Sequence, residues 1–291
     1  MLLLSKSVII LAVFSIDNTI LMKRKITHHS EKLQKVLARA GLGSRREIER
    51  QIAAGRIKVN RKIATVGLRV SETDDIWMDG RRIGIKSAQK QIKQVLCYHK
   101  PIGYVCSRND PTGLPSVFEN LPPAKNGRWI GVGRLDVNTS GLYFFTNDGD
   151  LANKLMHPSS EIEREYAVRV LGKVDMSMMK RLRAGIELDD GVAHFDILRE
   201  AGGEGANHWY HVSLKEGRRR EVRRLWESQG LQVSRLIRIR FGQLLLPPHL
   251  KMGRWELMDT ADFRKLYRHA NLPMPLEYKT YVKADRRRGR R

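Results

Sequence analysis

The stretch that decides the fold is Gly133-Arg134-Leu135-Asp136-Val137-Asn138-Thr139-Ser140-Gly141, followed by Leu142-Tyr143-Phe144-Phe145-Thr146. One carboxylate, Asp136, lies in a turn between glycines, and the apolar run after it is typical of a buried strand. The whole chain of 291 residues has a formal net charge of +23. A single acid before a buried strand of a strongly cationic protein is a candidate catalytic group that acts on a polyanion.

The net charge indicates what kind of partner the protein binds. Lysine and arginine number 54 against 31 acidic residues, and such an excess favours a nucleic-acid partner. An anionic membrane is the weaker alternative, because no amphipathic helix combines a basic face with an aromatic edge. No apolar run approaches the ~18 residues of a membrane span. We therefore expect a nucleic-acid partner and no membrane partner.

The two cysteines and the first residues indicate the compartment. Cys97 and Cys106 form no C-x-x-C pair and have no histidine at zinc-site spacing, so we expect reduced thiols, no metal and a cytoplasmic protein. The first 21 residues contain apolar runs that Lys6 interrupts, and no small-residue cleavage site follows. We interpret residues 1–30 as a disordered extension, with Met22 as a natural start, rather than as a secretion signal.

A small helix–strand module comes next. Leu33, Val36, Leu37 and Ala40 lie on one helical face. A capping box, Ser44-Arg45-Arg46-Glu47, opens a second helix. Alternation around residues 57–59 predicts a strand, and Asn60-Arg61 and Asp79-Gly80 predict tight turns.

The polar face of this module is basic. Any one of these charges is most simply a solvated surface residue, but seven fall within eighteen residues. The module resembles the S4 RNA-binding domain over residues 31–80, through Lys32-Leu33-Gln34-Lys35-Val36-Leu37-Ala38, the capping box and Gly55-Arg56-Ile57-Lys58-Val59-Asn60. The resemblance implies docking on structured RNA, for which the candidate residues are Arg45, Arg46, Arg50, Arg56 and Lys58.

A larger second domain follows a polar linker at residues 87–91. Strands are predicted at residues 95–98, 142–145, 165–170 and 209–214, and a short helix at 150–156. The absence of a regular βαβ alternation favours the α+β class over a doubly wound sheet. The last nine residues hold six basic side chains against one acid, which predicts a basic tail within residues 271–291.

Asp136 has two structural alternatives to catalysis. The pattern Asp136-x-Asn138-x-Ser140-Gly141 resembles the start of an EF-hand loop, but the twelfth position is Asn147 rather than glutamate. A plain turn aspartate stays open as an interpretation when the turn is taken by itself.

Two further segments supply candidate partners for Asp136. In residues 215–226, Val222, Leu225 and Trp226 share a helical face, which places Arg219 and Arg223 on the other side. An arginine on such a helix can pair with a buried carboxylate and keep it ionised. Tyr166 lies near the start of a predicted strand, where it is either a core residue or a stacking platform for an extruded base.

Five separated motifs occur in order and make the chain similar to the pseudouridine synthases, in the RsuA/RluB branch that carries an N-terminal S4 domain. They are Lys100-Pro101-x-Gly103; Gly133-Arg134-Leu135-Asp136-x-x-Thr139-x-Gly141-Leu142; Glu165-Tyr166; Glu216-Gly217-Arg218-x-Arg220-Glu221-Val222-Arg223-Arg224; and Arg240-x-Gly242 with Gly253-x-Trp255-x-Leu257. Several other stretches look most similar to members that modify large-subunit rRNA, among them Ser107-Arg108-Asn109-Asp110-Pro111 and Leu155-Met156-His157-Pro158-Ser159.

The resemblance implies an S4 domain of αββ type at residues 31–90 and a mixed, largely antiparallel catalytic domain at 91–270. It also implies isomerisation of uridine to pseudouridine in 23S rRNA or a large-subunit assembly intermediate, in domain V near the peptidyl-transferase region. Base flipping and no cofactor are expected, and we expect a monomer.

The resemblance also assigns roles to residues. Asp136 would be the nucleophile, Arg223 its ion-pair partner and Tyr166 the stacking residue. Further RNA-binding candidates are Lys100, Arg134, Arg218, Arg220 and Arg224. Attack at ribose C1′, attack at the base and a glycal route stay open, and the alternative function is a non-catalytic S4-type rRNA-binding or ribosome-assembly protein.

Overall fold

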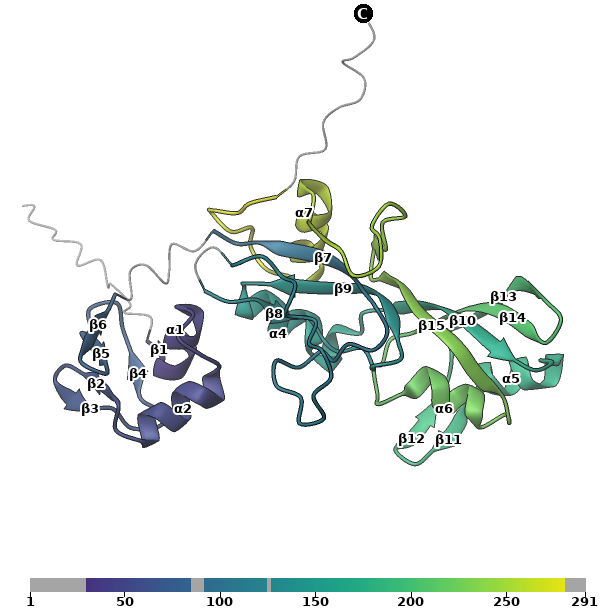
Figure 1. The fold of residues 1–291 in the computed structure, drawn as a ribbon, viewed down its shortest axis with the longest axis horizontal. Coiled ribbons are helices and arrows are strands. Elements are labelled where there is room, and N and C mark those ends of the chain that lie inside the picture. Colours follow the sequence, from purple (N-terminus) through teal and green to yellow (C-terminus); the bar gives the residue numbers. More distant parts are fainter. Residues whose placement is uncertain (1–29, 85–91, 125–126, 281–291) are drawn as a thin grey trace, which may run out of the picture.

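The computed structural model describes residues 30–84, 92–124 and 127–280, which form a small N-terminal domain and a large domain beside it (Figure 1). The predicted extension up to residue 29, the linker at 87–91 and the end of the basic tail from 281 onward lie outside the described residues. No helix within the described ranges has the length and apolarity that a bilayer crossing requires.

The N-terminal domain packs two helices on a short antiparallel sheet. The helices are α1 (Leu33–Arg39) and α2 (Arg45–Ala53). The sheet has the order β3-β2-β5-β6, and a separate pair joins β1 to β4. The strand bounds are β1 Glu31–Lys32, β2 Ile57–Val59, β3 Lys62–Ile63, β4 Arg69–Val70, β5 Ile76–Met78 and β6 Arg81–Ile83.

Local sequence signals determine this domain. The Ser44 side chain accepts a hydrogen bond from the Glu47 amide, and the Glu47 carboxylate accepts one from the Ser44 amide, so the predicted capping box is confirmed. Both predicted turns have two residues of positive φ, at Asn60 and Arg61 and at Asp79 and Gly80, as hairpins with a type I′ turn require. The domain has its own apolar core of ten buried residues.

The large domain is built on one nine-stranded sheet with the order β13-β14-β10-β15-β9-β7-β17, in which β16 pairs with β15 and β8 with β9. Only the contact between β9 and β15 is parallel in the described ladders, so the expected mixed, largely antiparallel sheet of an α+β protein is confirmed. The bounds are β7 Val95–Lys100, β8 Ile130–Gly131, β9 Ser140–Thr146, β10 Arg164–Leu171, β13 Ile197–Glu204, β14 Asn207–Leu214, β15 Gln232–Phe241, β16 Leu244–Leu245 and β17 Trp255–Leu257.

Helices and a hairpin cover the two faces of this sheet (Figure 1). They are α4 (Gly149–Met156), the 3-10 turn η1 (Pro158–Ser160), α5 (Met176–Ala184), α6 (Glu221–Glu227), α7 (Thr260–His269) and the pair β11 (Ile186–Leu188) and β12 (Gly191–Ala193). Tyr143 and Phe145 of β9 point into one apolar core and Leu142 and Phe144 into the other. Burial on both faces explains why β9 is a continuous apolar run rather than an alternating one.

The chain after α7 returns to the sheet. The sequence assigns residues 271–291 to a tail, yet within the described part of that range Tyr278 stacks on Phe263 with ring centroids 5.0 Å apart. The Lys93 amide donates to the Glu277 carbonyl oxygen, and the Lys279 amide donates to that of Lys93. The Thr280 hydroxyl is hydrogen-bonded to that of Thr260, so the chain is packed against the large domain as far as residue 280.

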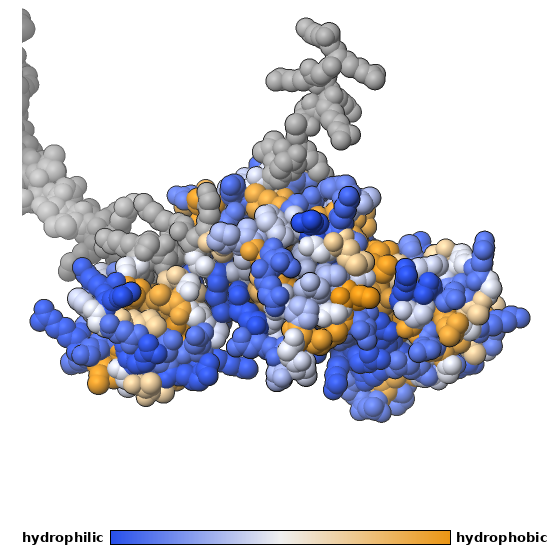
Figure 2. Space-filling model, viewed as in Figure 1, coloured by the Kyte–Doolittle hydropathy of each residue, from blue (hydrophilic) through white to orange (hydrophobic). Residues whose placement is uncertain are grey.

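The surface of both domains is mainly hydrophilic, in contrast to their apolar cores. Figure 2 shows hydrophilic side chains over much of the visible face of both domains, with smaller apolar areas between them. Arg45, Arg46 and Lys58 are exposed side chains of the N-terminal domain.

The contact between β9 and β15 leaves no room for a side chain at Gly141. This residue has φ +110°, and an added Cβ would lie 2.6 Å from the Arg238 amide nitrogen and closer still to its carbonyl oxygen. Gly141 is therefore the point at which β9 can lie against β15 and carry the preceding turn to the sheet.

We predict that Gly141→Ala lowers the free energy of unfolding by about 2 kcal/mol or more, because backbone overlap adds to the strain of a positive φ. Urea titration of the purified protein measures this. Gly133→Ala is the control: Gly133 also has a positive φ but has open space around its Cβ position, so it should cost about 1 kcal/mol. Equal costs for the two variants would contradict the proposed overlap.

Candidate active site

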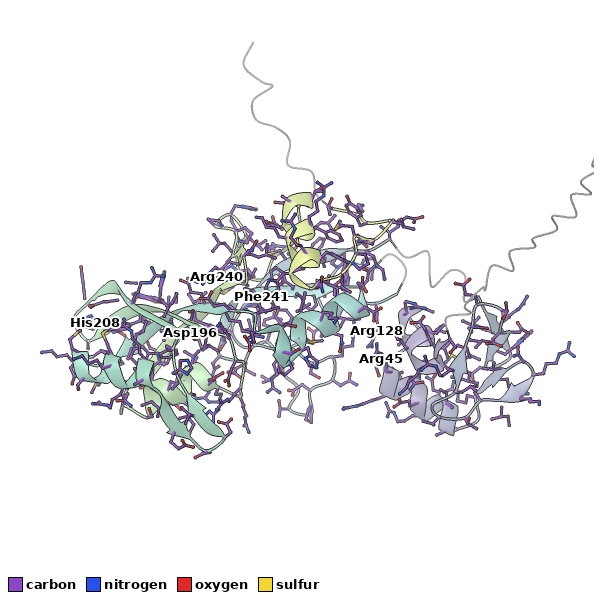
Figure 3. All side chains as sticks on the ribbon, turned by 180° about the vertical axis from the view of Figure 1, so that it is seen from behind. Arg45, Arg128, Asp196, His208, Arg240 and Phe241 are labelled. Atoms are coloured by element: carbon purple, nitrogen blue, oxygen red, sulfur yellow. The ribbon has the colours of Figure 1, made fainter. Side chains whose placement is uncertain are left out.

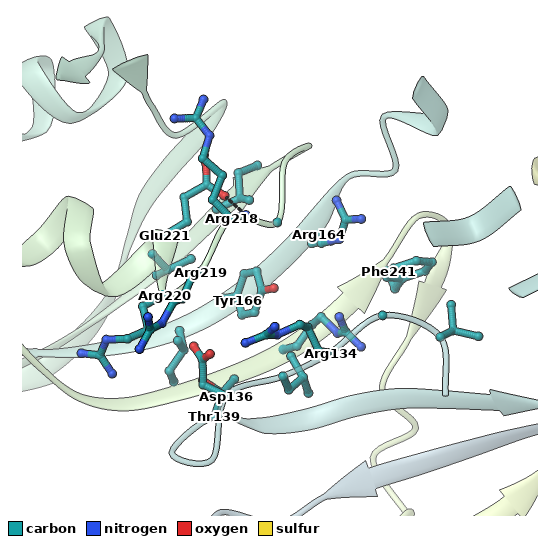
Figure 4. A pocket seen from close by; sticks show the side chains of 18 of the residues that line it. Arg134, Asp136, Thr139, Arg164, Tyr166, Arg218, Arg219, Arg220, Glu221 and Phe241 are labelled. Carbon is teal, nitrogen blue, oxygen red and sulfur yellow. Dashed lines mark hydrogen bonds and ion pairs between the residues drawn. The ribbon is translucent and has the colours of Figure 1, made fainter. Parts of the chain in front are cut away.

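A cavity of about 360 Å³ lies over the middle of the large sheet, where β9, β10 and β15 meet the loop before α6 (Figure 4). Asp136 and Thr139 enter it from the turn before β9, Tyr166 from β10 and Arg238 from β15. Its size is in the range of small-molecule and nucleotide sites. The structure therefore brings the sequence-predicted Asp136 and Tyr166 to one cavity.

A buried ammonium group holds the turn that carries Asp136. Lys100, at the end of β7, is 0% exposed. Its Nζ donates to the carbonyl oxygens of Pro101 at 2.9 Å, Asp136 at 3.1 Å, Val137 at 3.3 Å and Thr139 at 2.9 Å. The expectation that Lys100 binds RNA is corrected, because its donors are used inside the protein. Burial lowers the pKa of Lys100 to about 8.

The side chain of Asp136 is half-buried and faces the cavity (Figure 4). Among the described residues its carboxylate has no hydrogen-bond or ion-pair partner. The Thr139 hydroxyl, which lines the same cavity, is buried without a hydrogen bond. The acceptor and the hydroxyl are therefore both available to a bound molecule.

Arg223 does not form the expected ion pair with Asp136. It is 7% exposed, and its Nη1 donates to the Val233 carbonyl oxygen and its Nη2 to that of Asn138, both at 2.8 Å. Burial and the charge of Arg220 lower the pKa of Arg223, and the charge of Asp136 opposes them. Arg223 thus acts on Asp136 only through its charge, and it holds the same turn through the Asn138 carbonyl oxygen.

The prediction that Arg219 and Arg223 lie on the same side of one helix is also wrong. Helix α6 begins at Glu221, and Arg220 before it has φ 51°, so the helical register does not extend back to Arg219. Arg219 lies instead in the loop that forms one wall of the cavity. The apolar face of Val222, Leu225 and Trp226 is buried as predicted.

The other RNA-binding candidates of the large domain differ in what they already contact. Arg134 is exposed at the cavity and has no partner among the described residues. Arg218 donates to the carbonyl oxygens of Gly191 and Val192, which fastens the β11–β12 hairpin to the cavity wall. Arg220 pairs with Glu227 at 2.9 Å. Arg224 pairs with both carboxylate oxygens of Asp190, at 2.9 and 2.8 Å, and lies outside the cavity lining.

In the N-terminal domain, Arg56 forms a two-point pair with Asp79. The other four candidates have no partner among the described residues and remain open for a ligand; they are Arg45, Arg46, Arg50 and Lys58.

Two arginines of the cavity were not singled out from the sequence. Arg164 donates to the carbonyl oxygens of Ile162, Lys215 and Glu216, and burial lowers its pKa. Arg238 is 2% exposed, and its Nε donates to the Leu142 carbonyl oxygen at 2.7 Å. Strands β10 and β15 each contain several charged residues, so the sequence does not show which arginine faces the cavity, whereas the strand register does.

One guanidinium nitrogen of Arg238 has no partner among the described residues. Its Nη2 is buried and has no hydrogen-bond partner, and its guanidinium lies 5.3 Å from the Phe241 ring centroid and 5.9 Å from that of Tyr143. Arg238 is the direct cross-strand partner of Tyr166, so the two side chains share one face of the sheet. A buried guanidinium nitrogen without a partner is costly unless a ligand supplies an acceptor.

Comparisons with known proteins identify the families of the two domains. The S4 domain family matches residues 31–76, and the RNA pseudouridylate synthase family matches residues 94–228. Ribosomal large subunit pseudouridine synthase B of Salmonella typhimurium is 56% identical over 261 residues, which is 89% of this chain and 90% of that protein. The protein of the same name from Escherichia coli K12 is 55% identical over the same shares.

The solved structure titled "Crystal structure of pseudouridylate synthase" aligns with a TM-score of 0.57 and 24% identity, over 81% of this chain and 99% of that one. This likeness supports the fold.

An S4-type domain joined to a mixed sheet that bears an aspartate cavity defines a class of RNA-modifying isomerase. The chain belongs to the pseudouridine synthases, in the branch that carries an N-terminal S4 domain. Both sequence relatives quoted above are pseudouridine synthase B proteins. The prediction of an enzyme is therefore confirmed, against the alternative of a non-catalytic binding protein.

We predict that Lys100→Met lowers the rate of pseudouridine formation at saturating RNA by about 10-fold or more, because loosening the Asp136 turn misplaces the carboxylate. RNA affinity should change less than about twofold, since Lys100 faces the protein. Single-turnover rates and a filter-binding curve give the two values. Lys251→Met, at an exposed lysine, is the control. A variant with normal rate and reduced affinity would restore the RNA-binding role.

Proposed function

We propose that this protein converts a uridine of large-subunit ribosomal RNA to pseudouridine. The substrate is 23S rRNA or a large-subunit assembly intermediate, with the target in domain V near the peptidyl-transferase region. The names of the sequence relatives support the large subunit. The observation that carries the proposal is the cavity in which the unpaired Asp136 carboxylate lies near Tyr166 in a protein of charge +23.

The reaction breaks the bond between ribose C1′ and N1 of uracil, turns the base and joins C1′ to C5. The proton lost from C5 is balanced by one gained at N1, so oxidation state does not change. Since these atoms are covered in a stacked helix, we propose that the uridine is flipped into the cavity, as in other enzymes that act on a base. The cavity volume of about 360 Å³ is compatible with one nucleotide.

Asp136 is the proposed nucleophile. Its turn is held by two cations, by Lys100 through three carbonyl oxygens of the turn and by Arg223 through the Asn138 carbonyl oxygen. The backbone of the turn is thereby restrained while the carboxylate stays free, which is the arrangement that a positioned nucleophile needs. Attack at C1′, attack at the base and a glycal route all use this carboxylate.

Tyr166 is the proposed stacking residue. The side chain is 8% exposed. Its strand, β10, is paired along its length with β14 on one side and β15 on the other. A ring held in this way offers a rigid face to a flipped uracil. Its hydroxyl is a candidate for moving the C5 proton.

Arg238 supports binding of the base. We assign its unpartnered Nη2 to a carbonyl oxygen of the flipped uracil, because the side chain lies deep in the cavity beside Tyr166. Arg134 is exposed at the cavity and is the proposed phosphate contact there.

The proposal extends to organisation. We propose that the protein acts in the cytoplasm as a monomer and without a cofactor. We also propose that the boundary between its two domains lies between residues 90 and 91. Among the described residues, no group of three or more His, Cys, Asp or Glu side chains could hold a metal ion.

We predict that Asp136→Asn lowers pseudouridine formation by about 10³-fold or more, because the amide is not nucleophilic, while RNA affinity stays within about twofold. Tritium release from RNA labelled at uracil C5 measures turnover. Asp189→Asn, at an exposed acid outside the cavity, should match the wild-type protein. Turnover of Asp136→Asn at a wild-type rate would remove the catalytic assignment.

We predict that Arg238→Met lowers kcat/KM for the RNA by about 10- to 100-fold, which corresponds to the loss of one charge-assisted hydrogen bond. Arg235→Met, at an exposed position of the same strand, is the matched control. Because the Leu142 contact is lost as well, the melting temperature is measured in parallel. A fall in stability without a fall in kcat/KM of the folded fraction would show that Arg238 only packs the core.

A further inference from the structure

A second cavity, of about 290 Å³, lies between the two domains. Lys35, Arg45 and Arg46 line it from the N-terminal domain, and Arg128 and one side of α4 line it from the large domain. An ion pair between Lys35 and Asp150, with 2.9 Å between nitrogen and oxygen, bridges the domains beside it. Figure 3 labels Arg45 and Arg128, which lie close together at the boundary of the two domains.

The domains also approach each other closely through their backbones. A Cβ at Gly41 would lie 3.0 Å from the Gly127 Cα atom. Gly41 follows α1, and Gly127 directly precedes Arg128. The glycine contact thus brings the basic residues of the two domains to one cleft.

The three arginines of this cleft form no close ion pair, because the two acids of its lining, Asp148 and Asp150, pair with Lys93 and Lys35 instead. Arg45, Arg46 and Arg128 have no hydrogen-bond or ion-pair partner among the described residues. Burial lowers the pKa of Arg128, the charge of Glu47 opposes this, and the charge of Arg45 lowers it further. Two other arginines of the N-terminal domain do have acidic partners, since Arg39 pairs with Glu31 and Arg56 with Asp79.

A further arginine, Arg108, lies near Arg128. Arg108 donates to the Trp129 carbonyl oxygen, and both burial and the charge of Arg128 lower its pKa. Cys106, two residues earlier, contacts the backbone of Leu135, the neighbour of Asp136, at 3.4 Å. Like charges held together in a partly desolvated cleft favour an anionic ligand.

The two cavities share a residue. Met156, the last residue of α4, lines both the cavity of Asp136 and the cleft between the domains. The eight residues of α4 span about 12 Å. A chain that leaves the first cavity therefore reaches the second within a few nucleotides.

We propose that the cleft between the domains binds the sugar–phosphate backbone of the substrate strand beside the flipped uridine, with Arg45, Arg46 and Arg128 as ligands of its phosphates. The inference rests on the proposed function, because a cleft that shares the lining residue Met156 with the Asp136 cavity favours the RNA substrate over other polyanions. One strand then contacts both domains, and the pair of Lys35 with Asp150 sets the spacing between them. The RNA-binding surface of the N-terminal domain and the catalytic cavity would then form one RNA-binding surface.

The test uses the full-length chain with Arg128→Met and, as a matched control, Arg264→Met at an exposed arginine of α7 outside the cleft. A fluorescent fragment of 23S rRNA domain V is titrated by anisotropy between 50 and 200 mM salt. Arg128→Met should weaken binding about fivefold and reduce the slope of log affinity against log salt by about one, as loss of one phosphate contact does.

Three outcomes overturn the inference. They are unchanged affinity and slope, an equal loss in Arg264→Met that reflects only net charge, and a lower melting temperature with an unchanged slope, which would make Arg128 a packing residue. Arg45→Met should lower the slope in the same way as Arg128→Met. Failure of the proposed function is a separate result: a wild-type protein that binds the fragment with a steep slope yet forms no pseudouridine.

Discussion

Two buried cations hold the turn that carries Asp136 by donating to its main-chain oxygens. Lys100 contacts three carbonyl groups of the turn and that of Pro101, and Arg223 contacts the Asn138 carbonyl. A turn of this kind leaves carbonyl oxygens without partners in a buried place, and such groups are costly unless donors reach them. By satisfying them, the two cations leave the carboxylate as the free acceptor of the cavity.

The sheet supplies the frame on which this turn rests. The parallel contact of β9 with β15 exists only because Gly141 has no side chain, and it places Arg238 beside the start of β9. The antiparallel pairing of β15 with β10 then places Tyr166 opposite Arg238. Three strands that are distant in sequence thus bring a carboxylate, a phenol ring and a buried guanidinium to one cavity.

Positive charge in this protein has two different uses. Lys100, Arg218, Arg223 and Arg224 act inside the fold, through carbonyl oxygens or Asp190. Arg45, Arg46, Arg128 and Arg134 have no such partners among the described residues. Composition counts both groups alike, so the excess of arginine indicates the class of partner but does not show which side chains meet it.

The sequence by itself was sufficient for the local elements and for the choice of Asp136 as a candidate site residue. The capping box at Ser44, the tight turns at Asn60 and Asp79 and the buried strand after Gly141 depend on residues within a few positions of each other, so their pattern can be read directly. The Gly-bounded aspartate likewise marks its own turn.

Only the tertiary structure decided the partners of each charge. Lys100 and Arg223 were expected to face RNA and Asp136, but converging carbonyl oxygens from another segment accept their hydrogen bonds. Arg238 and the cleft at Arg128 depend on strand register and domain contact. Such contacts join residues far apart along the chain, and the choice between water, backbone and ligand depends on burial that neighbouring residues do not encode.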